Sequence, residues 1–152
     1  MFTSYPLDKS HAKNPLAALF NQAVVEISLL TNWIKNDVDP GNNDPLPATA
    51  LASELAFDLA GMGDLHVTVG GGRNSKLGQY LGQGRTLGDL LQNDMYKVTV
   101  EGVDTGKQLL PGFRHACKEN TLNADDFPLT NAILDVIEKD VAFNFEFGNL
   151  PG

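Results

Sequence analysis

The sequence predicts an all-α domain, and three observations support this fold class. Apolar residues recur at three- and four-residue spacing along several segments, which is typical of helices that bury one face. The only strand-like alternation, Leu65 to Val69, is too short to build a sheet. The chain has 152 residues, enough for one domain with a hydrophobic core and too few for two domains of usual size.

The first helix is expected to begin at Asn14-Pro15, because Asn caps free N–H groups and Pro is tolerated at the first helical position. The polar residues 1–13 are expected to form a flexible lead-in, and residues 14–152 a single helical domain. This helix is predicted to end near Asn36. Its expected buried stripe comprises Leu16, Leu19, Phe20, Ala23, Val24, Ile27, Leu30 and Ile34.

The middle of the chain alternates between loops and short helices. Residues 37–47 hold three prolines and are predicted to form a loop. Strong helix formers predict a helix over residues 48–60, which Gly61 ends. Asn74 or Ser75 is expected to cap a short helix that runs through Leu81. Thr86 with Asp89 resembles a capping box and predicts a helix through Asn93.

Two further helices are predicted in the last third of the chain. The first runs from about Val100 to Lys118, and Pro111 inside it is expected to kink or split it. Phe127-Pro128 opens the second, which runs through Asp140. Three phenylalanines in the tail after it predict that part of the tail docks on the core. The residues expected to be buried on the last helix are Leu129, Ile133, Val136 and Ile137.

Composition excludes several classes of function. The net charge is −8 with 11 Lys and Arg, which argues against binding to nucleic acids or anionic membranes. No apolar run approaches the ~20 residues that span a bilayer, and the first residues lack a secretory pattern, so we expect a cytoplasmic protein. The single cysteine, Cys117, excludes an internal disulfide and a cysteine zinc cluster, and His66 and His115 share no ligand spacing.

The residues from Asp64 to Asn74 have the parts of an anion-binding site. Gly70, Gly71 and Gly72 allow the backbone to approach a ligand closely, at a cost in conformational entropy. Arg73-Asn74 then stands at the start of a helix, whose free N–H groups and positive dipole end suit an anion. The planar fork of arginine matches a phosphate or a carboxylate. A flexible loop followed by a solvated arginine would explain the same residues, and no P-loop or GxGxxG pattern occurs.

Four segments of the chain resemble NAD-dependent glycerol-3-phosphate dehydrogenases, in the family's order. The most specific is LAGMGDLHVTVGGGRNSKLG at 59–78; the others are VEGVDTGKQL at 100–109, FPLTNAILDVI at 127–137, and the first helix, 15–34, with Glu26 in its middle. The resemblance covers most of the chain. It implies the C-terminal, substrate-binding domain of the family, a multi-helix bundle like those of glycerol-3-phosphate and 6-phosphogluconate dehydrogenases.

The resemblance also implies a role for individual residues. Asp64 and Thr68 would contact the glycerol end of sn-glycerol 3-phosphate or dihydroxyacetone phosphate, the family's two substrates. Arg73 and Asn74 would hold the substrate phosphate. A purely structural role would also explain the first two residues, with Asp64 as a cap after Gly63 and Thr68 as a buried hydroxyl.

The cofactor implied by the resemblance is NAD or NADP. Arg73, Thr99 and Glu101 match the family positions that contact it. Glu101 is equally explained as an acidic residue in the first turn of its helix, where the helix dipole favours a negative charge.

The family's general acid–base, a lysine in an L-K-N segment, has no counterpart here. Lys13-Asn14 lies in the turn before the first helix and is interpreted as solvated, so the catalytic lysine and the Rossmann half would fall upstream of Met1. We therefore expect no catalytic residue in this chain and no dehydrogenase activity from it alone. Loss of the partner domain would expose an apolar patch, which predicts a homo-oligomer.

Two other functions remain open at this point. One is a catalytically inactive helical module for interaction or dimerisation that retains the family scaffold. The other is a related dehydrogenase domain for a different hydroxy acid, against which Arg73-Asn74 argues because the pair suits a phosphate.

Overall fold

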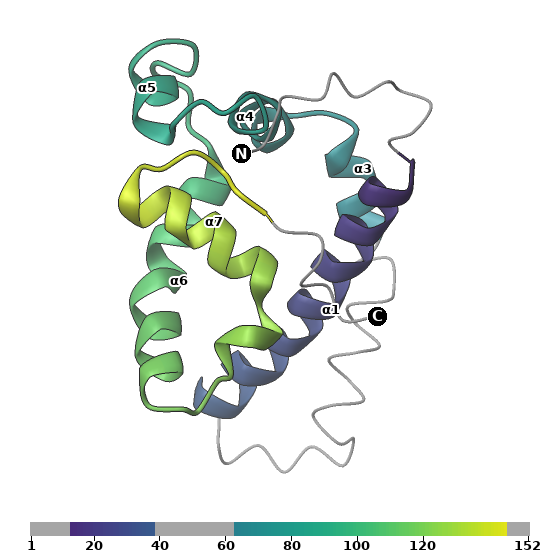
Figure 1. Cartoon of the computed structure of the whole chain (residues 1–152), viewed down its shortest axis with the longest axis vertical. Coiled ribbons are helices and arrows are strands. Elements are labelled where there is room, and N and C mark those ends of the chain that lie inside the picture. The colour runs from purple at the N-terminus through teal and green to yellow at the C-terminus, as the bar shows by residue number, and fades with distance from the viewer. Residues whose placement is uncertain (1–12, 39–62, 146–152) are drawn as a thin grey trace.

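The structure is a computed structural model, and it describes residues 13–38 and 63–145. These residues form six α-helices and one short 3-10 helix with no strand among them, which confirms the all-α prediction (Figure 1). The elements are α1 (Lys13–Val38), α3 (Asp64–Val69), α4 (Arg73–Leu81), α5 (Leu87–Gln92), α6 (Glu101–Lys118), the 3-10 helix (Ala124–Asp126) and α7 (Pro128–Lys139).

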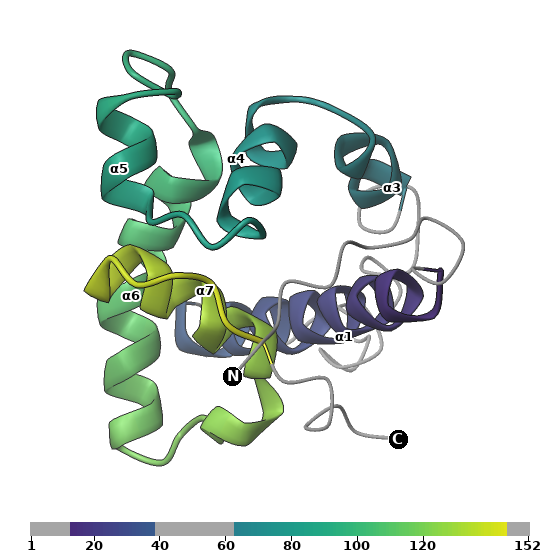
Figure 2. The same cartoon turned by 45° about the horizontal axis from the view of Figure 1, so that its top comes forward.

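Helices α6 and α7 lie side by side and form the centre of the described fold (Figures 1 and 2). Helix α1 contacts α7. Helix α4 contacts α3, α5 and the beginning of α6. Figure 2 shows α3 and α4 on the same side of α1, joined by a short connection. This arrangement brings the start of α4 to the start of α6.

The hydrophobic core consists of two clusters that share α6 and α7. The first gathers α4, α5 and the beginning of α6 around Leu90, which is fully buried. The second joins the end of α6 to α1 and to the start of α7, with the rings of Phe113 and Phe127 edge to face at 5.4 Å. Ile137 packs against both clusters, so α7 connects them.

The tail after α7 docks on the fold, as predicted. Phe143 packs against the first cluster and Phe145 is 8% exposed, while the third phenylalanine of the tail lies outside the described residues. Helices α6 and α7 approach closely at Gly106, where an added Cβ would run into the side chain of Ile137. Pro111 is exposed and lies within one continuous helix, so the predicted split of this helix is wrong.

Helix α1 contacts α7 through a polar junction that its apolar pattern did not predict. Glu26 is 2% exposed and accepts hydrogen bonds from the backbone N–H groups of Leu129 (2.8 Å) and Thr130 (2.6 Å). The hydroxyl of Thr130 and Nε2 of Gln22 donate to the same carboxylate. The carboxylate therefore caps the positive end of α7.

Several expectations about α1 and α7 are wrong. Leu16, Ile27 and Ile34 are 58%, 36% and 45% exposed, while the polar residues Gln22 and Glu26 are buried on the same helix. On α7, Ile133 is 45% exposed and Leu134 is buried in its place. The helix α1 also begins at Lys13, so Lys13 is helical rather than part of a lead-in loop and Asn14 is not the cap.

The segment Leu65 to Val69 is helical and not extended. As the last five residues of α3 it satisfies its own backbone groups locally, which a lone strand with no partner cannot do. His66, Val67 and Val69 are exposed. Of the expected loop at 37–47, Asp37 and Val38 are the last residues of α1. The rest of that loop, the expected helix at 48–60 and most of the expected lead-in lie outside the described residues.

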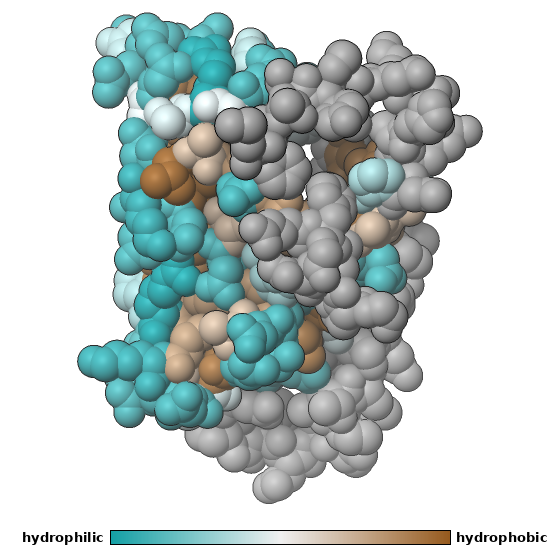
Figure 3. All heavy atoms as spheres, viewed as in Figure 1, coloured by the Kyte–Doolittle hydropathy of each residue, from teal (hydrophilic) through white to brown (hydrophobic). Residues whose placement is uncertain are grey.

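The described surface in Figure 3 is mostly polar, with smaller apolar areas between the polar residues. Among the described helices, none is long and apolar enough to cross a membrane.

Candidate anion-binding site

The glycine loop ends in a backbone conformation that requires glycine. Gly72 precedes α4 with φ +100°, in the left-handed region that residues with a side chain rarely adopt. It takes the capping position that we had expected for Asn74 or Ser75, so these two residues lie inside the first turn. The hydroxyl of Ser75 instead donates to the carbonyl oxygen of Val69 at 3.1 Å, which ties the loop to the end of α3.

The first two residues of α4 bind the first two residues of α6. Nη2 of Arg73 lies 2.7 Å from Oε1 of Glu101 in an ion pair. Oδ1 of Asn74 accepts a hydrogen bond of 3.1 Å from the backbone N–H of Gly102. Two helix N-termini that are 28 residues apart in the sequence therefore meet at one place. We call these four residues the α4–α6 junction.

The α4–α6 junction has the electrostatic character of an anion site. Each helix N-terminus carries free N–H groups and roughly half a positive charge from the helix dipole. Arg73 adds a full positive charge with five N–H donors, of which the ion pair with Glu101 engages Nη2. The charges of Arg73 and Glu101 cancel formally, so the positive character of the junction comes from the two helix N-termini and from the donors of Arg73 that Glu101 leaves open.

The ion pair at the junction is open to exchange with a ligand. The side chains of Arg73 and Glu101 are 53% and 74% exposed. An ion pair at this exposure contributes only about 0–1 kcal/mol, because water and salt compete with it. Glu101 contacts only Nη2, whereas a phosphate can offer two oxygens to the guanidinium, and this bidentate geometry lets a phosphate compete with the carboxylate.

Two cavities adjoin the junction, and Asn74 lines both. One, of about 390 Å³, opens beside Glu101 and Gly102 and is lined further by Thr105, Thr130 and Ile133 among others. The other, of about 230 Å³, lies between α4, α6 and α7 and is almost entirely apolar. The exposure of Ile133, unexpected from the sequence, is explained by its position between these cavities.

The structure brings together three of the six residues that the sequence singled out, namely Arg73, Asn74 and Glu101. Thr99 is exposed and stands two residues before Glu101, just ahead of α6. Asp64 and Thr68 lie on α3, four residues apart, and α3 contacts α4. Their side chains lie outside what the structure describes.

Neither Gly102, which lies in the VEGVDTGKQL segment, nor Thr130 was among the residues that the sequence singled out for the site. The signal for Gly102 was present, because a glycine in the first turn of a helix lowers helix propensity and so indicates a close approach. No local pattern marks Thr130, whose backbone and hydroxyl bind Glu26 from more than a hundred residues away.

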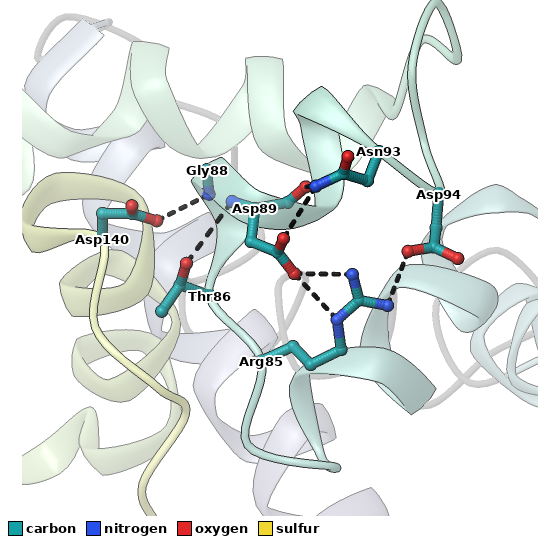
Figure 4. Close-up of polar contacts among 7 residues, drawn as sticks. All are labelled: Arg85, Thr86, Gly88, Asp89, Asn93, Asp94 and Asp140. Atoms are coloured by element: carbon teal, nitrogen blue, oxygen red, sulfur yellow. Dashed lines mark hydrogen bonds and ion pairs between the residues drawn. The ribbon is translucent and has the colours of Figure 1, made fainter.

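A second polar cluster surrounds Arg85, between α4 and α5 (Figure 4). Its guanidinium lies 2.5 Å from Asp89 and 2.6 Å from Asp94, and Thr86 caps α5 as predicted by accepting from the N–H of Asp89. Hydrogen bonds from Arg85 and then from Asn93 hold the pKa of Asp89 below its ordinary value. Both carboxylates are paired with the same guanidinium, so this cluster holds the loop after α5 in place.

Metal binding finds no support in residues 13–38 and 63–145, where no group of three His, Cys, Asp or Glu side chains is close enough to hold an ion. Burial raises the pKa of the half-buried Cys117 thiol above its ordinary value, which disfavours the thiolate form that acts as a nucleophile.

Fold and site together define an all-helical domain in which two helix N-termini and an arginine converge. The sequence model of the family described as "NAD-dependent glycerol-3-phosphate dehydrogenase C-terminus" matches residues 8–145. This chain belongs to that family, whose dehydrogenases depend on NAD or NADP. No solved structure matches the chain.

A curated relative supports the same assignment. The chain is 34% identical over 142 residues to a protein named glycerol-3-phosphate dehydrogenase [NAD(P)+] from Latilactobacillus sakei subsp. sakei (strain 23K). The aligned region covers 92% of this chain and 35% of the relative, so the chain spans about a third of that protein's length.

Proposed function

We propose that this chain is the substrate-binding domain of an NAD(P)-dependent glycerol-3-phosphate dehydrogenase and that the α4–α6 junction binds the substrate phosphate. The observation that supports it most is the meeting of Arg73 and Asn74 with the start of α6. The fork of Arg73 and the free N–H groups of two helices suit the oxygens of a phosphate monoester.

Binding of the phosphate would orient the reacting carbon of the substrate. A phosphate fixed at one end of a three-carbon molecule limits the positions of its carbinol carbon, which lowers the entropic cost of hydride transfer. In this proposal Asp64 and Thr68 of α3 contact the hydroxyl groups at the glycerol end. The contact between α3 and α4 makes this geometry feasible for a small substrate.

The cofactor would lie on the other side of Arg73, against Thr99 and Glu101. NAD or NADP accepts or donates the hydride when it is bound. The exposed carboxylate of Glu101 suits the hydroxyl groups of a ribose better than phosphate oxygens, because it can only accept hydrogen bonds. The chain fits only part of a dinucleotide, since its sequence contains no GxGxxG fingerprint. We therefore propose that a nucleotide-binding domain completes the site.

A binding titration of the purified chain tests the phosphate assignment. With ¹⁵N-labelled protein, sn-glycerol 3-phosphate is expected to shift the Nε–H signal of Arg73 and the amide signals at the start of α4 and α6. Glycerol, which lacks the phosphate, should leave them unchanged. Arg73→Ala should weaken binding by about 10-fold or more, because it removes charge-assisted hydrogen bonds of about 1.5–3 kcal/mol.

Lys107→Ala provides the matched control, because it removes a positive charge from α6 one and a half turns away from the junction. Its affinity for sn-glycerol 3-phosphate should stay within about twofold of the wild type, since Lys107 is exposed and water and salt weaken its effect on the junction. A wild-type chain that shows no shift at Arg73 or Asn74 at any concentration of the phosphate would contradict the proposal and favour an inactive helical module. Light scattering of the same samples tests whether the chain is a homo-oligomer.

A further inference from the structure

The contact between Gly102 and Asn74 is so close that a side chain at position 102 would have to displace the carboxamide. A Cβ added to Gly102 would lie 3.0 Å from Oδ1 and 3.3 Å from Cγ of Asn74, closer than ordinary van der Waals contact. The φ of Gly102 is not positive, so a larger residue here would meet a shortage of space and no backbone strain. The carboxamide of Asn74 thus lies directly against the backbone of α6.

This contact decides which way the carboxamide points. The backbone N–H of Gly102 is a donor, so only the oxygen of Asn74 can accept from it, at 3.1 Å. With Oδ1 held against α6, the two N–H bonds of Nδ2 point elsewhere. Within the described parts of the chain, Nδ2 has no hydrogen-bond partner, and Asn74 lines the cavity of about 390 Å³ beside Glu101.

We propose that Gly102 is a positioning residue that makes Asn74 a dedicated hydrogen-bond donor for an anion. A free carboxamide presents its oxygen or its nitrogen with nearly equal ease, and the oxygen repels a phosphate. Gly102 removes this ambiguity by binding the oxygen. The proposal deepens the proposed function and rests on it, because it concerns the same phosphate.

The ion pair between Arg73 and Glu101 does not fix the orientation of the Arg73 side chain in the same way. Glu101, the partner of Arg73, is 74% exposed and forms its contact through a flexible side chain. Gly102, the partner of Asn74, donates from a backbone N–H that its helix holds in place. Of the two contacts at the α4–α6 junction, the one between Asn74 and Gly102 is therefore the rigid one. It keeps its orientation after a ligand displaces the ion pair.

The test is Gly102→Ala in the whole 152-residue chain. The variant should fold, because alanine favours a helix more than glycine does, and circular dichroism with thermal unfolding checks this. The added methyl group should push the carboxamide away and free it to rotate. We expect the affinity for sn-glycerol 3-phosphate to fall about tenfold, which corresponds to the loss of one charge-assisted hydrogen bond.

The readout that separates positioning from stability is the side-chain NH₂ signal of Asn74. In the wild type this signal should shift as sn-glycerol 3-phosphate is added; in Gly102→Ala the shift should be lost while the Nε–H of Arg73 still responds. Gly112→Ala is the matched control: it lies on the same helix, and its methyl group meets only the ring of Trp33 at an ordinary 3.6 Å. It should behave as the wild type does.

Asn74→Asp keeps an acceptor for the N–H of Gly102 but replaces the donor with a second oxygen. Its affinity should fall at least as far as that of Gly102→Ala. Wild-type affinity in either variant, or an Asn74 signal that still shifts in Gly102→Ala, overturns the positioning role. Absence of any shift in the wild type instead overturns the phosphate site itself, so the two failures are distinguishable.

Discussion

Glu26 is a negatively charged side chain buried in the middle of α1. Four hydrogen-bond donors of the protein take the place of the water molecules that its carboxylate loses on burial. These are Nε2 of Gln22, the N–H of Leu129, and the N–H and hydroxyl of Thr130. An isolated buried carboxylate would be strongly destabilising, so each donor matters. The dipole of α7 adds to the stabilisation because the carboxylate stands at its positive end.

Glu26→Gln should lower the free energy of unfolding by about 2–4 kcal/mol, because it keeps the size of the side chain but removes its charge and turns one acceptor into a donor facing other donors. Chemical denaturation measures the change. Glu119→Gln, at an exposed position just after α6, is the control and should stay within about 0.5 kcal/mol of the wild type. An equal loss of unfolding free energy in both variants would show that the hydrogen bonds of Glu26 to α7 add no specific stability.

At the residue scale, the sequence predicted which side chains are chemically suited to the site but not how they pair. Arg73 and Asn74 stand out because they follow three glycines at a helix start. Their partners lie 28 residues away, and no local pattern specifies a contact at that separation. Glu26 was noted only through the family resemblance, since a single acidic residue in an apolar stripe resembles an ordinary interruption.

Among the elements, α5 and α7 are held together by an unusual cap. Asp140 ends α7 in the left-handed conformation, with φ 51°, and its Oδ1 accepts from the N–H of Gly88 in the first turn of α5 at 2.6 Å (Figure 4). One side chain therefore stabilises the end of one helix and the start of another. An added Cβ on Gly88 would lie 2.5 Å from the same carboxylate, so both positions are constrained.

Asp140→Ala should destabilise the domain by about 2 kcal/mol, because the hydrogen bond is lost and alanine is strained in the left-handed region. Asp140→Asn is the matched variant: it keeps an acceptor oxygen and tolerates the conformation, so its unfolding free energy should change by about 0.5 kcal/mol or less. Thermal unfolding compares the two. A loss of equal size in both would indicate that the negative charge, and not the hydrogen bond, is what matters.

The loop after α5 should respond to acid through Asp89, whose lowered pKa comes mainly from Arg85 and secondly from Asn93. A carboxyl group with a lowered pKa stabilises the fold above the ordinary aspartate pKa of about 3.9, and this contribution is lost as the pH falls through the lowered value. A carboxyl ¹³C titration measures it. Arg85→Met should raise the pKa of Asp89 more than Asn93→Ala does; the reverse order would contradict the assigned causes.

The boundaries of elements were predictable where a local signal sets them. Thr86 caps α5, and Phe127-Pro128 opens α7, as their sequence patterns indicate. Leu65 to Val69 alternates as a strand does, yet it is helical because a segment without a strand partner satisfies its backbone only by forming a helix. The exposure of Ile133 could not be predicted, because helical spacing cannot tell a core from the wall of a cavity.

At the scale of the whole molecule, the two clusters of the core explain why the site forms. The first cluster fixes α4 and the start of α6, and the second fixes the end of α6 against α1 and α7. Ile137 of α7 packs against both clusters, and the missing side chain at Gly106 lets α6 lie close to Ile137. The α4–α6 junction thus depends on packing among distant segments, and this is why the fold class followed from the sequence while the junction did not.

This 152-residue chain is expected to have no dehydrogenase activity when it is purified alone. We expect no oxidation of NADH with dihydroxyacetone phosphate, because the sequence contains neither a dinucleotide fingerprint nor the family's L-K-N segment with the proton-transferring lysine. The α4–α6 junction offers donors for a phosphate, but phosphate binding only orients a substrate, and orientation without a held hydride donor gives no reaction. Absorbance at the NADH wavelength measures this, with the NMR titration of the same preparation as proof that the domain is folded. Turnover above that of Arg73→Ala would contradict the prediction and would require a cofactor site within this chain.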